Sequence, residues 1–414
     1  MWKWLFSIFT IILVAAVGYW FSLNSGVRYL ILNPPDNENV LFWTTEQRDA
    51  GFRALEYLDI LPKRTISKSD EKTSNHTDNN EKNKPIELEP GKPLAIPDEK
   101  IADYFKSQRI AALVVIHEGK LVFEGYGLDF DADSKWTSFS VAKSFTSTLV
   151  GAALKDGYIK SLQDKVTDYI PSMRGSAYDD VSIEQLLTMT SGVKWNEDYS
   201  DPQSDVSQFN FHQPDPGIDA TASYMRKLPR ASAPGANWVY STGETNLIGL
   251  LVSRATGKPL ADYLSEKIWQ HIGAEQNASW ILGPSNHEIS GCCIQATTRD
   301  FARFGLFILN GAKVGGEGAT GSSIVPDNWF NLATRKQADT GSEDMGYGYQ
   351  WWTWEDGSFQ GRGIFGQGIF IDPGKDLVIA VNSNWPVASS AEYNARKFAM
   401  YRDIQKAVTD SESN

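Results

Sequence analysis

The distribution of strand patterns constrains the fold of this chain more than any other feature of its sequence. The apolar run at residues 111–117, a tight turn at Gly119 and the returning run at 121–126 predict a β-hairpin. Strand patterns return only near the other end, at 349–354, 363–371 and 377–382. The stretch between them is mostly helical in its periodicity. We therefore expect an α+β protein, in which an antiparallel sheet flanked by helices is built from both ends of a domain that also carries a mostly helical subdomain over residues 138–287.

The first 23 residues are nearly all apolar, and Lys3 is their only charged residue. This length suits a transmembrane helix, and a cleavable signal peptide is the competing interpretation. We favour an uncleaved anchor, because no Ala-x-Ala cleavage site is visible and residues 19–21 resemble an interfacial aromatic belt. Since Lys3 holds the short N-terminal side in the cytoplasm, we expect a membrane-anchored protein whose main domain lies on the extracytoplasmic (periplasmic) side.

The rest of the chain divides by composition into three segments. Residues 24–61 predict a short N-terminal extension, with a capped helix start at Thr44. Residues 62–93 are polar and predict a flexible linker, because such a segment cannot bury a core. The main domain is expected over residues 94–410.

Charge and cysteine content exclude some classes of function. The formal net charge of the 414 residues is −12, and no extended basic block is present, which argues against a nucleic-acid partner. The two cysteines, Cys292 and Cys293, are adjacent and cannot link distant segments. A bond between neighbours would be strained, so we expect no disulfide framework and instead a packed turn of small residues.

Ser140 and Lys143 are the residues most typical of catalysis. Apolar residues recur at helical spacing after Ser140, which places this serine at the start of an amphipathic helix. Residues i and i+3 share a helix face, so Lys143 can contact Ser140 and act as its base if burial lowers the lysine pKa. Ser-x-x-Lys also occurs at residues 69–72, in the polar segment, and at 191–194, in a turn. A solvated helix cap is the alternative interpretation for Ser140.

Other catalytic patterns are absent from the sequence. It contains no Gly-x-Ser-x-Gly elbow, no Walker loop and no His-Glu-x-x-His, and the five histidines lack metal-ligand spacing. Residues 361–366 match a dinucleotide fingerprint, but no βαβ unit surrounds them. A serine enzyme built on this sequence would need a base other than histidine, and Lys143 could fill that role.

Four motifs in a fixed order carry a resemblance to a known family. They are Ser140-Val141-Ala142-Lys143, the capped helix at 181–192, Tyr240-Ser241-Thr242, and Gly366-Gln367-Gly368. Over residues 98–405 the chain resembles the serine β-lactamase-related hydrolases, which include class C β-lactamases, DD-peptidases, family VIII esterases and 6-aminohexanoate-dimer hydrolases. The segments 195–202 and 349–352 look most like the aminohexanoate-hydrolase branch.

The resemblance implies a β-lactamase/DD-peptidase-like fold and a set of roles. Ser140 would be the acylated nucleophile, and Lys143 and Tyr240 would share proton transfer, with Tyr240 as a phenolate held by Lys143 in one version. The Ser140 amide and an amide within 366–370 would form the oxyanion hole. Substrate would be bound by four residues: Gly366, Gln367, Gly368 and Tyr199, the last closing over it. No metal and no organic cofactor is implied.

Two departures from the family pattern narrow the expected substrate. Thr242 stands where the tyrosine motif usually has asparagine, and Gly366-Gln367-Gly368 replaces a Lys-Thr-Gly motif, so the usual cation is missing. We therefore expect cleavage of a small ester or amide through an acyl-enzyme, rather than lactamase or peptidase activity. The alternative is a non-catalytic or slowly acylating binding or sensor protein for cell-wall or β-lactam-like ligands.

Overall fold

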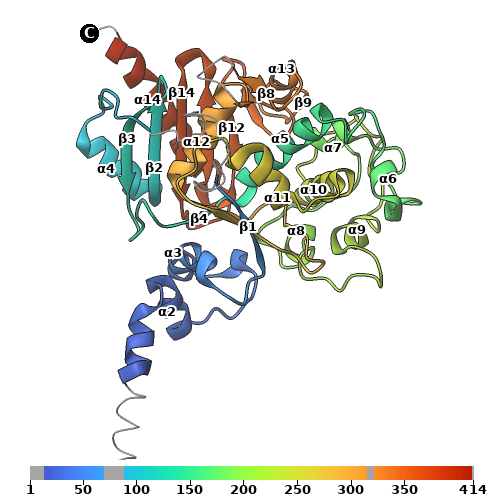
Figure 1. Ribbon diagram of the computed structural model, residues 1–414, viewed down its shortest axis with the longest axis horizontal. Coiled ribbons are helices and arrows are strands. Elements are labelled where there is room, and N and C mark those ends of the chain that lie inside the picture. The colour runs from blue at the N-terminus through green and yellow to red at the C-terminus, as the bar shows by residue number, and fades with distance from the viewer. Residues whose placement is uncertain (1–13, 70–87, 315–320, 413–414) are drawn as a thin grey trace, which may run out of the picture.

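The computed structural model describes residues 14–69, 88–314 and 321–412 (Figure 1). An eight-stranded antiparallel sheet forms one side of the molecule, and a mostly helical region forms the other. The fold expected from the sequence is thus confirmed. Both ends of the main domain contribute strands to this sheet.

The main sheet has the strand order β3-β2-β14-β13-β12-β11-β10-β9. Its strands are β2 (Ile110–His117), β3 (Lys120–Tyr126), β9 (Ala338–Asp339), β10 (Met345–Tyr347), β11 (Trp352–Trp354), β12 (Phe359–Arg362), β13 (Gly368–Asp372) and β14 (Leu377–Ser383). Strands β2 and β14 are buried along their whole length, which explains why their sequences are continuous apolar runs rather than alternating ones.

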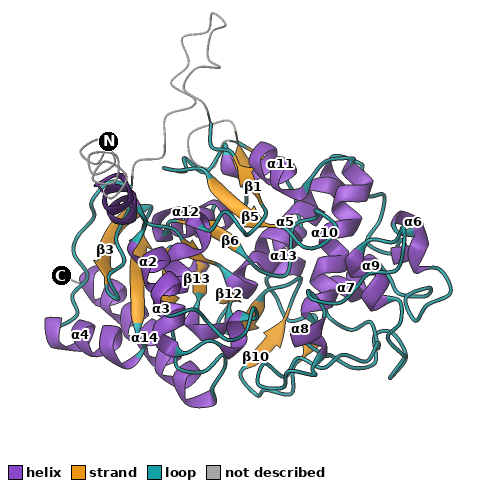
Figure 2. Cartoon of the chain, turned by 90° about the horizontal axis from the view of Figure 1, so that it is seen from below, coloured by secondary structure: helices purple, strands orange, loops and turns teal. Residues whose placement is uncertain are grey.

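Alternate residues of the central strands face two separate cores. Val378 and Ala380 of β14 belong to the larger core, under α5 (Ala142–Lys155) and α12 (Thr298–Leu309). Their neighbours Leu377, Ile379 and Val381 face the smaller core, under α4 (Asp98–Ser107) and α14 (Ala391–Glu412). Figure 2 shows α12 and α14 on opposite sides of these strands.

The helical region surrounds α5 and α10 (Thr242–Thr256), which pack against each other. Its other helices are α6 (Val166–Tyr169), α7 (Ile183–Leu187), α8 (Asp205–Gln208), α9 (Ala220–Met225) and α11 (Leu260–Leu264). A four-stranded sheet of order β1-β5-β6-β4 closes one end, with β1 (Lys63–Ile66), β4 (Trp136–Thr137), β5 (Ala278–Ile281) and β6 (Ile294–Ala296). A short pair, β7 (Lys313–Val314) and β8 (Ser322–Ser323), and α13 (Trp329–Ala333) follow α12 in the chain.

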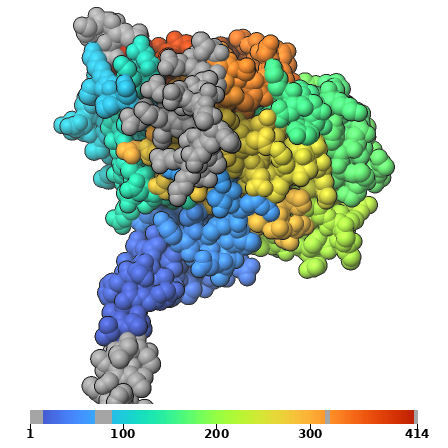
Figure 3. All heavy atoms as spheres, viewed as in Figure 1, coloured from blue at the N-terminus to red at the C-terminus, as the bar shows by residue number. Residues whose placement is uncertain are grey.

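The segment before the main domain differs in part from the sequence prediction. The N-terminal segment extends from the body at one side (Figure 3), where helix α2 (Ser25–Leu32) packs on α3 (Thr45–Ala54). Helix α3 begins with the predicted capping box at Thr44. Strand β1 lies inside the predicted linker 62–93 and pairs with β5 of the main domain. The linker prediction is therefore wrong for residues 63–66. Residues 70–87 of that linker lie outside the described residues.

The predicted membrane anchor lies mostly outside the described residues, since residues 1–13 are not among them. Residues 14–22 are helical and expose Val14, Val17, Tyr19 and Phe21. Within the part of the chain that the structure describes, no helix combines the length and the apolarity needed to span a membrane.

Candidate active site

Ser140 lies in the single 3-10 turn η3 (Phe139–Val141) that leads directly into α5. The preceding residue, Phe139, has a φ of +42°, a left-handed conformation that a non-glycine residue rarely adopts. Ser140 retains 8% of its exposure, so the hydroxyl lies at the edge of the protein interior.

Lys143 contacts Ser140 from the next turn, as the i to i+3 spacing predicts. Its Nζ donates to Ser140 Oγ at 2.9 Å, to Thr242 Oγ1 at 3.0 Å and to the Gly291 carbonyl at 2.8 Å. Lys143 is 1% exposed, and this burial lowers its pKa to about 8, while the charge of Glu197 acts in the opposite direction. About a tenth of the amine is therefore neutral at pH 7, and the neutral fraction rises with pH.

Tyr240 completes the group around the Ser140 hydroxyl. The Lys143 ammonium lies 5.2 Å from the centroid of the Tyr240 ring, and the phenol is within hydrogen-bonding reach of Ser140. Burial and the Glu197 charge raise the pKa of Tyr240 above its usual value, although the Ser140 contact opposes them. The resting phenol is thus protonated, which leaves Lys143 as the available base.

Glu197 is a member of the site that sequence reasoning missed. Its carboxylate accepts from the Thr242 hydroxyl, from the Thr242 amide at 3.0 Å and from the indole of Trp195. Thr242 in turn accepts from Lys143, so its hydroxyl links the carboxylate to the ammonium. Thr242 stands where the family pattern has asparagine. Its hydroxyl contacts both Lys143 and Glu197. The acidic loop at 195–202 was visible in the sequence, but its contact with Thr242 was not.

Tyr199, expected to bind substrate, is held by the same carboxylate. Its phenol donates to Glu197 Oε1 at 2.8 Å, and burial raises its pKa well above the usual value. The structure thus brings Tyr199 to the candidate site with Ser140, Lys143 and Tyr240, through Glu197.

Gly366-Gln367-Gly368, expected to bind substrate, lies one strand further from the nucleophile. Gln367 is fully buried, and its amide group bonds to Trp136, to Asn382 and to the backbone of Ser383. Its side-chain amide has no atom left for a ligand, so a substrate-binding role for the Gln367 side chain does not fit this placement. Gly366 and Gly368 pack against the side chains of Trp385 and Tyr401.

Strand β12 is the strand that borders the nucleophile instead. A Cβ on Gly361 would lie 2.9 Å from Ser144 Oγ, and one on Gly363 would lie 2.7 Å from the Ser138 carbonyl oxygen. Glycine therefore allows the backbone of this strand and its end to approach the turn that carries Ser140. The sequence pattern predicted one continuous strand over residues 363–371. In the structure β12 ends at Arg362, η7 (Ile364–Gly366) follows, and β13 begins only at Gly368.

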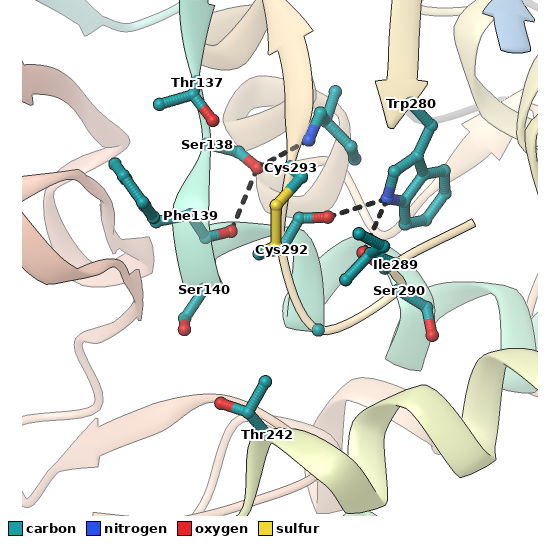
Figure 4. Close-up of a disulfide and its surroundings, with 12 residues drawn as sticks. Thr137, Ser138, Phe139, Ser140, Thr242, Trp280, Ile289, Ser290, Cys292 and Cys293 are labelled. Atoms are coloured by element: carbon teal, nitrogen blue, oxygen red, sulfur yellow. Dashed lines mark hydrogen bonds between the residues drawn. A yellow bond between two sulfur atoms is a disulfide. The ribbon is translucent and has the colours of Figure 1, made fainter. Parts of the chain in front are cut away.

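A disulfide between Cys292 and Cys293 lies beside the site (Figure 4). The bond was not expected, and the sequence account of a plain packed turn is corrected by it. The preceding residue, Gly291, holds Lys143, and the following one, Ile294, exchanges hydrogen bonds with Ser138 at 2.8 and 3.0 Å. The bonded pair therefore lies between Gly291, which binds Lys143, and β6, whose Ile294 contacts the residue before the nucleophilic turn.

This arrangement can activate a hydroxyl for attack on a carbonyl carbon. A serine accepts a hydrogen bond from a buried amine of lowered pKa, and a protonated phenol lies beside both. An amine that is partly neutral can take the serine proton, and a phenol can supply one to a leaving group.

Comparison with known proteins identifies a family that matches this chain. A family model described as Beta-lactamase matches residues 98–399. The 6-aminohexanoate-dimer hydrolase of Paenarthrobacter ureafaciens is 28% identical over 312 residues, which cover 72% of this chain and 78% of that protein. Esterase EstB of Burkholderia gladioli is 24% identical and covers 61% of this chain and 78% of its own length.

Solved structures share the fold. A Bacillus anthracis protein, described provisionally as a 6-aminohexanoate-dimer hydrolase, superposes with a TM-score of 0.70 at 22% identity, over 91% of this chain and 99% of that one. A family VIII carboxylesterase superposes with a TM-score of 0.57 at 18% identity, over 74% and 96% of the two chains.

Proposed function

Because the chain belongs to the β-lactamase family of serine hydrolases, we propose that it cleaves a small ester or amide through an acyl-enzyme on Ser140. The observation that carries this proposal is the 2.9 Å hydrogen bond from Lys143 to Ser140, made by an amine whose pKa is lowered to about 8. A serine hydroxyl needs an adjacent base to become a useful nucleophile, and Lys143 meets that need without histidine.

In the proposed acylation step, Ser140 Oγ attacks the carbonyl carbon and its proton passes to neutral Lys143. The carbon–oxygen or carbon–nitrogen bond of the leaving group then breaks, and Tyr240 donates the proton that the leaving group requires. The Lys143 ammonium restores the phenol proton of Tyr240. The raised pKa of Tyr240 supports its role as donor rather than as resting phenolate.

Deacylation reverses these roles, with water in the place of the leaving group. Neutral Lys143 accepts the proton of the attacking water, relayed by Tyr240, whose phenol gives its own proton to the amine as it takes the one from water. The Lys143 ammonium then returns this proton to Ser140 Oγ as the acyl–oxygen bond breaks. The Ser140 amide is one proposed donor to the oxyanion. A second would come from the segment at 363–364, since Gly363 borders the nucleophilic turn more closely than Gly368 does.

The substrate class rests on the names of relatives and on the site itself. One relative is named as a 6-aminohexanoate-dimer hydrolase and another as an esterase, so both amide and ester cleavage are consistent with related chains. Gly366-Gln367-Gly368, which the sequence analysis set against the family's Lys-Thr-Gly motif, carries no lysine, and Gln367 is buried away from the nucleophile. We therefore place esters and small amides ahead of β-lactams.

The experiment is hydrolysis of short para-nitrophenyl esters by the full-length protein, with intact-mass detection of an adduct after treatment with a fluorophosphonate. Ser140→Ala should abolish turnover and adduct formation, and Tyr240→Phe should reduce turnover. Ser147→Ala is the matched control, because Ser147 lies on the same helix but bonds to the Tyr349 carbonyl instead. This control should retain activity.

Two outcomes would change the proposal. An adduct on Ser140 that forms with esters but is not hydrolysed would favour the sensor interpretation. Full activity in Ser140→Ala would show that another residue is the nucleophile, and the acyl-enzyme assignment would be withdrawn.

We also propose that residues 1–23 anchor the protein in a membrane with the main domain on the extracytoplasmic side. The apolar composition of this segment and its single charge at Lys3 support the proposal. The full-length protein should sediment with membranes after a carbonate wash, and a chain that lacks residues 1–23 should not. Recovery of the full-length protein in the soluble fraction would contradict the proposal.

A further inference from the structure

The disulfide between Cys292 and Cys293 joins adjacent residues, so it does not connect separate elements of the fold. A disulfide usually stabilises a protein by closing a long loop of the unfolded chain, and this one closes none. What it constrains is the peptide unit between the two cysteines, which becomes part of a small ring. Cys293 has a φ of +79°, in the left-handed region that non-glycine residues rarely adopt. The ring holds Cys293 in this conformation, and a reduced chain is free to leave it.

The residue before the pair contacts the proposed base. The Gly291 carbonyl accepts from Lys143 Nζ at 2.8 Å, and the Gly291 amide donates to Asn246 Oδ1 at 2.7 Å. A Cβ on Gly291 would lie 3.4 Å from Lys143 Nζ, so the backbone of this loop packs directly against the amine. A change in the direction of the peptide between Gly291 and Cys292 therefore changes the hydrogen bond to Lys143.

The residue after the pair contacts the segment that leads to the nucleophile. The Ser138 amide donates to the Ile294 carbonyl at 2.8 Å, and the Ile294 amide donates to Ser138 Oγ at 3.0 Å. Figure 4 shows the disulfide between these contacts and Trp280, with Ser140 and Thr242 among the residues around it. The pair thus connects the partner of the base to the partner of the nucleophilic turn.

The Gly291 carbonyl decides where the lone pair of the base points. A neutral lysine amine has two N–H groups and one lone pair. Thr242 Oγ1 can accept one N–H at 3.0 Å, because its own proton goes to Glu197, and the Gly291 carbonyl accepts the other. The lone pair is then left facing Ser140 Oγ, which lies 2.9 Å from Lys143 Nζ. If the Gly291 carbonyl moves away, the amine can rotate and turn its lone pair from the serine.

A small dithiol can reach the bond, because both cysteines are only half-buried. One thiolate of the dithiol attacks a cysteine sulfur and forms a mixed disulfide, and the other cysteine leaves as a thiolate that takes up a proton. The second thiol of the reagent then displaces the first cysteine. The protein gains two thiols, and the dithiol is oxidised to its own disulfide. Because the chain has only two cysteines, no other protein thiol takes part.

We propose that the Cys292–Cys293 disulfide is a positioning element for the base. By fixing the Gly291 carbonyl it keeps Lys143 directed at Ser140, so that the protein is fully active only while the bond is intact and loses activity when a dithiol reduces it. This inference rests on the proposed function and adds a redox dependence to it. The cysteines act through Gly291 and Lys143 rather than on the substrate.

The test compares the full-length protein before and after treatment with dithiothreitol. The reagent is removed in the absence of air before the assay, because thiols attack esters themselves, and alkylation with intact-mass measurement counts the protein thiols. On the pH plateau of para-nitrophenyl ester hydrolysis, reduction should lower kcat by about 10-fold or more and change KM little, because the base is misdirected while substrate binding is retained. Reoxidation should restore kcat.

The matched variant is Cys292→Ser/Cys293→Ser, which cannot form the bond under any condition. Its kcat should equal that of the reduced wild-type protein, and dithiothreitol should leave it unchanged. Equal kcat in the oxidised and reduced wild-type proteins would overturn the inference. A loss of activity in dithiothreitol that the double variant shares would trace the effect to the reagent and would overturn it as well.

A measurement on Lys143 itself separates this inference from the proposed function. A carbonyl acceptor favours the charged amine, so its displacement should lower the pKa of Lys143 below the value of about 8 in the oxidised protein. Glu197 and Tyr240, ionisable groups that lie near this amine, are present in both forms. NMR titration of protein labelled with carbon-13 lysine, assigned with Lys143→Arg, measures the shift.

The two proposals then fail in different ways. An unchanged pKa of Lys143 on reduction would overturn the positioning role even if esters are hydrolysed. A lowered pKa without hydrolysis of any ester would contradict the catalytic proposal and leave the control of Lys143 by the disulfide standing.

Discussion

At the scale of single residues, the protonation state of Lys143 controls the proposed chemistry. Burial lowers the pKa of this lysine to about 8, and Glu197 raises it. The carboxylate acts through Thr242, whose hydroxyl bonds to both groups. Glu197 is therefore a positioning residue, which holds the threonine and limits how far the pKa of Lys143 falls.

Glu197→Gln should move the pH dependence of hydrolysis in a defined direction. Activity requires neutral Lys143, so kcat/KM of the wild-type protein should rise with pH through the lysine pKa of about 8. Removing the carboxylate charge lowers that pKa, so the rising limb should move to lower pH. The plateau rate should fall by about 10-fold, because Thr242 loses a charged acceptor. The measurement is a pH profile of ester hydrolysis.

Asp198→Asn is the control for Glu197→Gln, since it removes the same charge from the same loop. The Asp198 carboxylate is exposed and accepts hydrogen bonds only from the nearby residues Ser200 and Asp201. Its profile should match that of the wild-type protein. A limb that stays in place, or moves to higher pH, in Glu197→Gln would show that the carboxylate does not act on Lys143.

The sequence could predict local contacts at the site but not distant ones. Ser140 and Lys143 lie three residues apart on a helix, and helix geometry alone brings them together. The contact between Glu197 and Thr242 spans 45 residues and depends on how a loop folds onto α10. No spacing rule relates such positions, so Glu197 was seen only as part of an acidic loop.

At the scale of elements, α10 carries an ionisable group in its first turn that affects stability. Burial raises the pKa of Glu244 to about 8, although hydrogen bonds from Ser191 and Tyr178 lower it. The folded protein therefore holds this carboxyl protonated between its unfolded pKa of about 4.5 and about 8. Its contribution to the free energy of unfolding is complete below pH 4.5, declines as the pH rises and is lost above pH 8.

Glu244→Gln should remove this decline, because glutamine is neutral at every pH. The difference in free energy of unfolding, variant minus wild type, should therefore increase from pH 5 to pH 8. Each pKa unit corresponds to about 1.4 kcal/mol, so the relative gain should be of the order of a few kcal/mol. Urea denaturation at both pH values measures it. Glu266→Gln is the control, because Glu266 is exposed and pairs with Lys258, and it should show no such pH dependence. If Glu244→Gln changed the free energy of unfolding equally at both pH values, the prediction would be contradicted.

Elements with strong local signals were predictable, and elements defined by their partners were not. Strand β14 is such an element, since its continuous apolar run predicted a strand at 377–382 and the structure has one at Leu377–Ser383. Strand β1 has the polar sequence Lys63-Arg64-Thr65-Ile66, and only Ile66 is fully buried. Its strand conformation comes from pairing with β5, more than two hundred residues away, which no local pattern reveals.

At the scale of the whole molecule, the N-terminal segment is part of the body that carries the site. Arg48 of α3 bonds to Asn384 at 3.1 Å and to the Pro386 carbonyl at 2.8 Å, just after β14. Asp49 forms an ion pair with Arg109 at 2.5 Å, just before β2. The sequence analysis assigned residues 24–61 to a separate extension, because composition does not reveal contacts between distant segments of the chain. The folded unit therefore extends beyond residues 94–410.

Phe52 gives this long-range packing a direct test. Its ring is fully buried and lies 5.1 Å from Phe139, the residue before the nucleophile, and 5.4 Å from Trp136. Phe52→Ala should lower the free energy of unfolding by about 3–5 kcal/mol, because it leaves a cavity in an aromatic cluster.

Because Phe139 adopts a left-handed conformation that its surroundings must hold, the same substitution should also lower kcat for ester hydrolysis. Denaturant unfolding and ester kinetics measure the two effects. Tyr57→Ala, at an exposed ring in the same segment, should change neither by much. If Phe52→Ala were destabilised but hydrolysed esters at the wild-type rate, the N-terminal segment would support the fold without shaping the nucleophilic turn. If its stability were unchanged, residues 24–61 would be an independent extension, as their composition suggests.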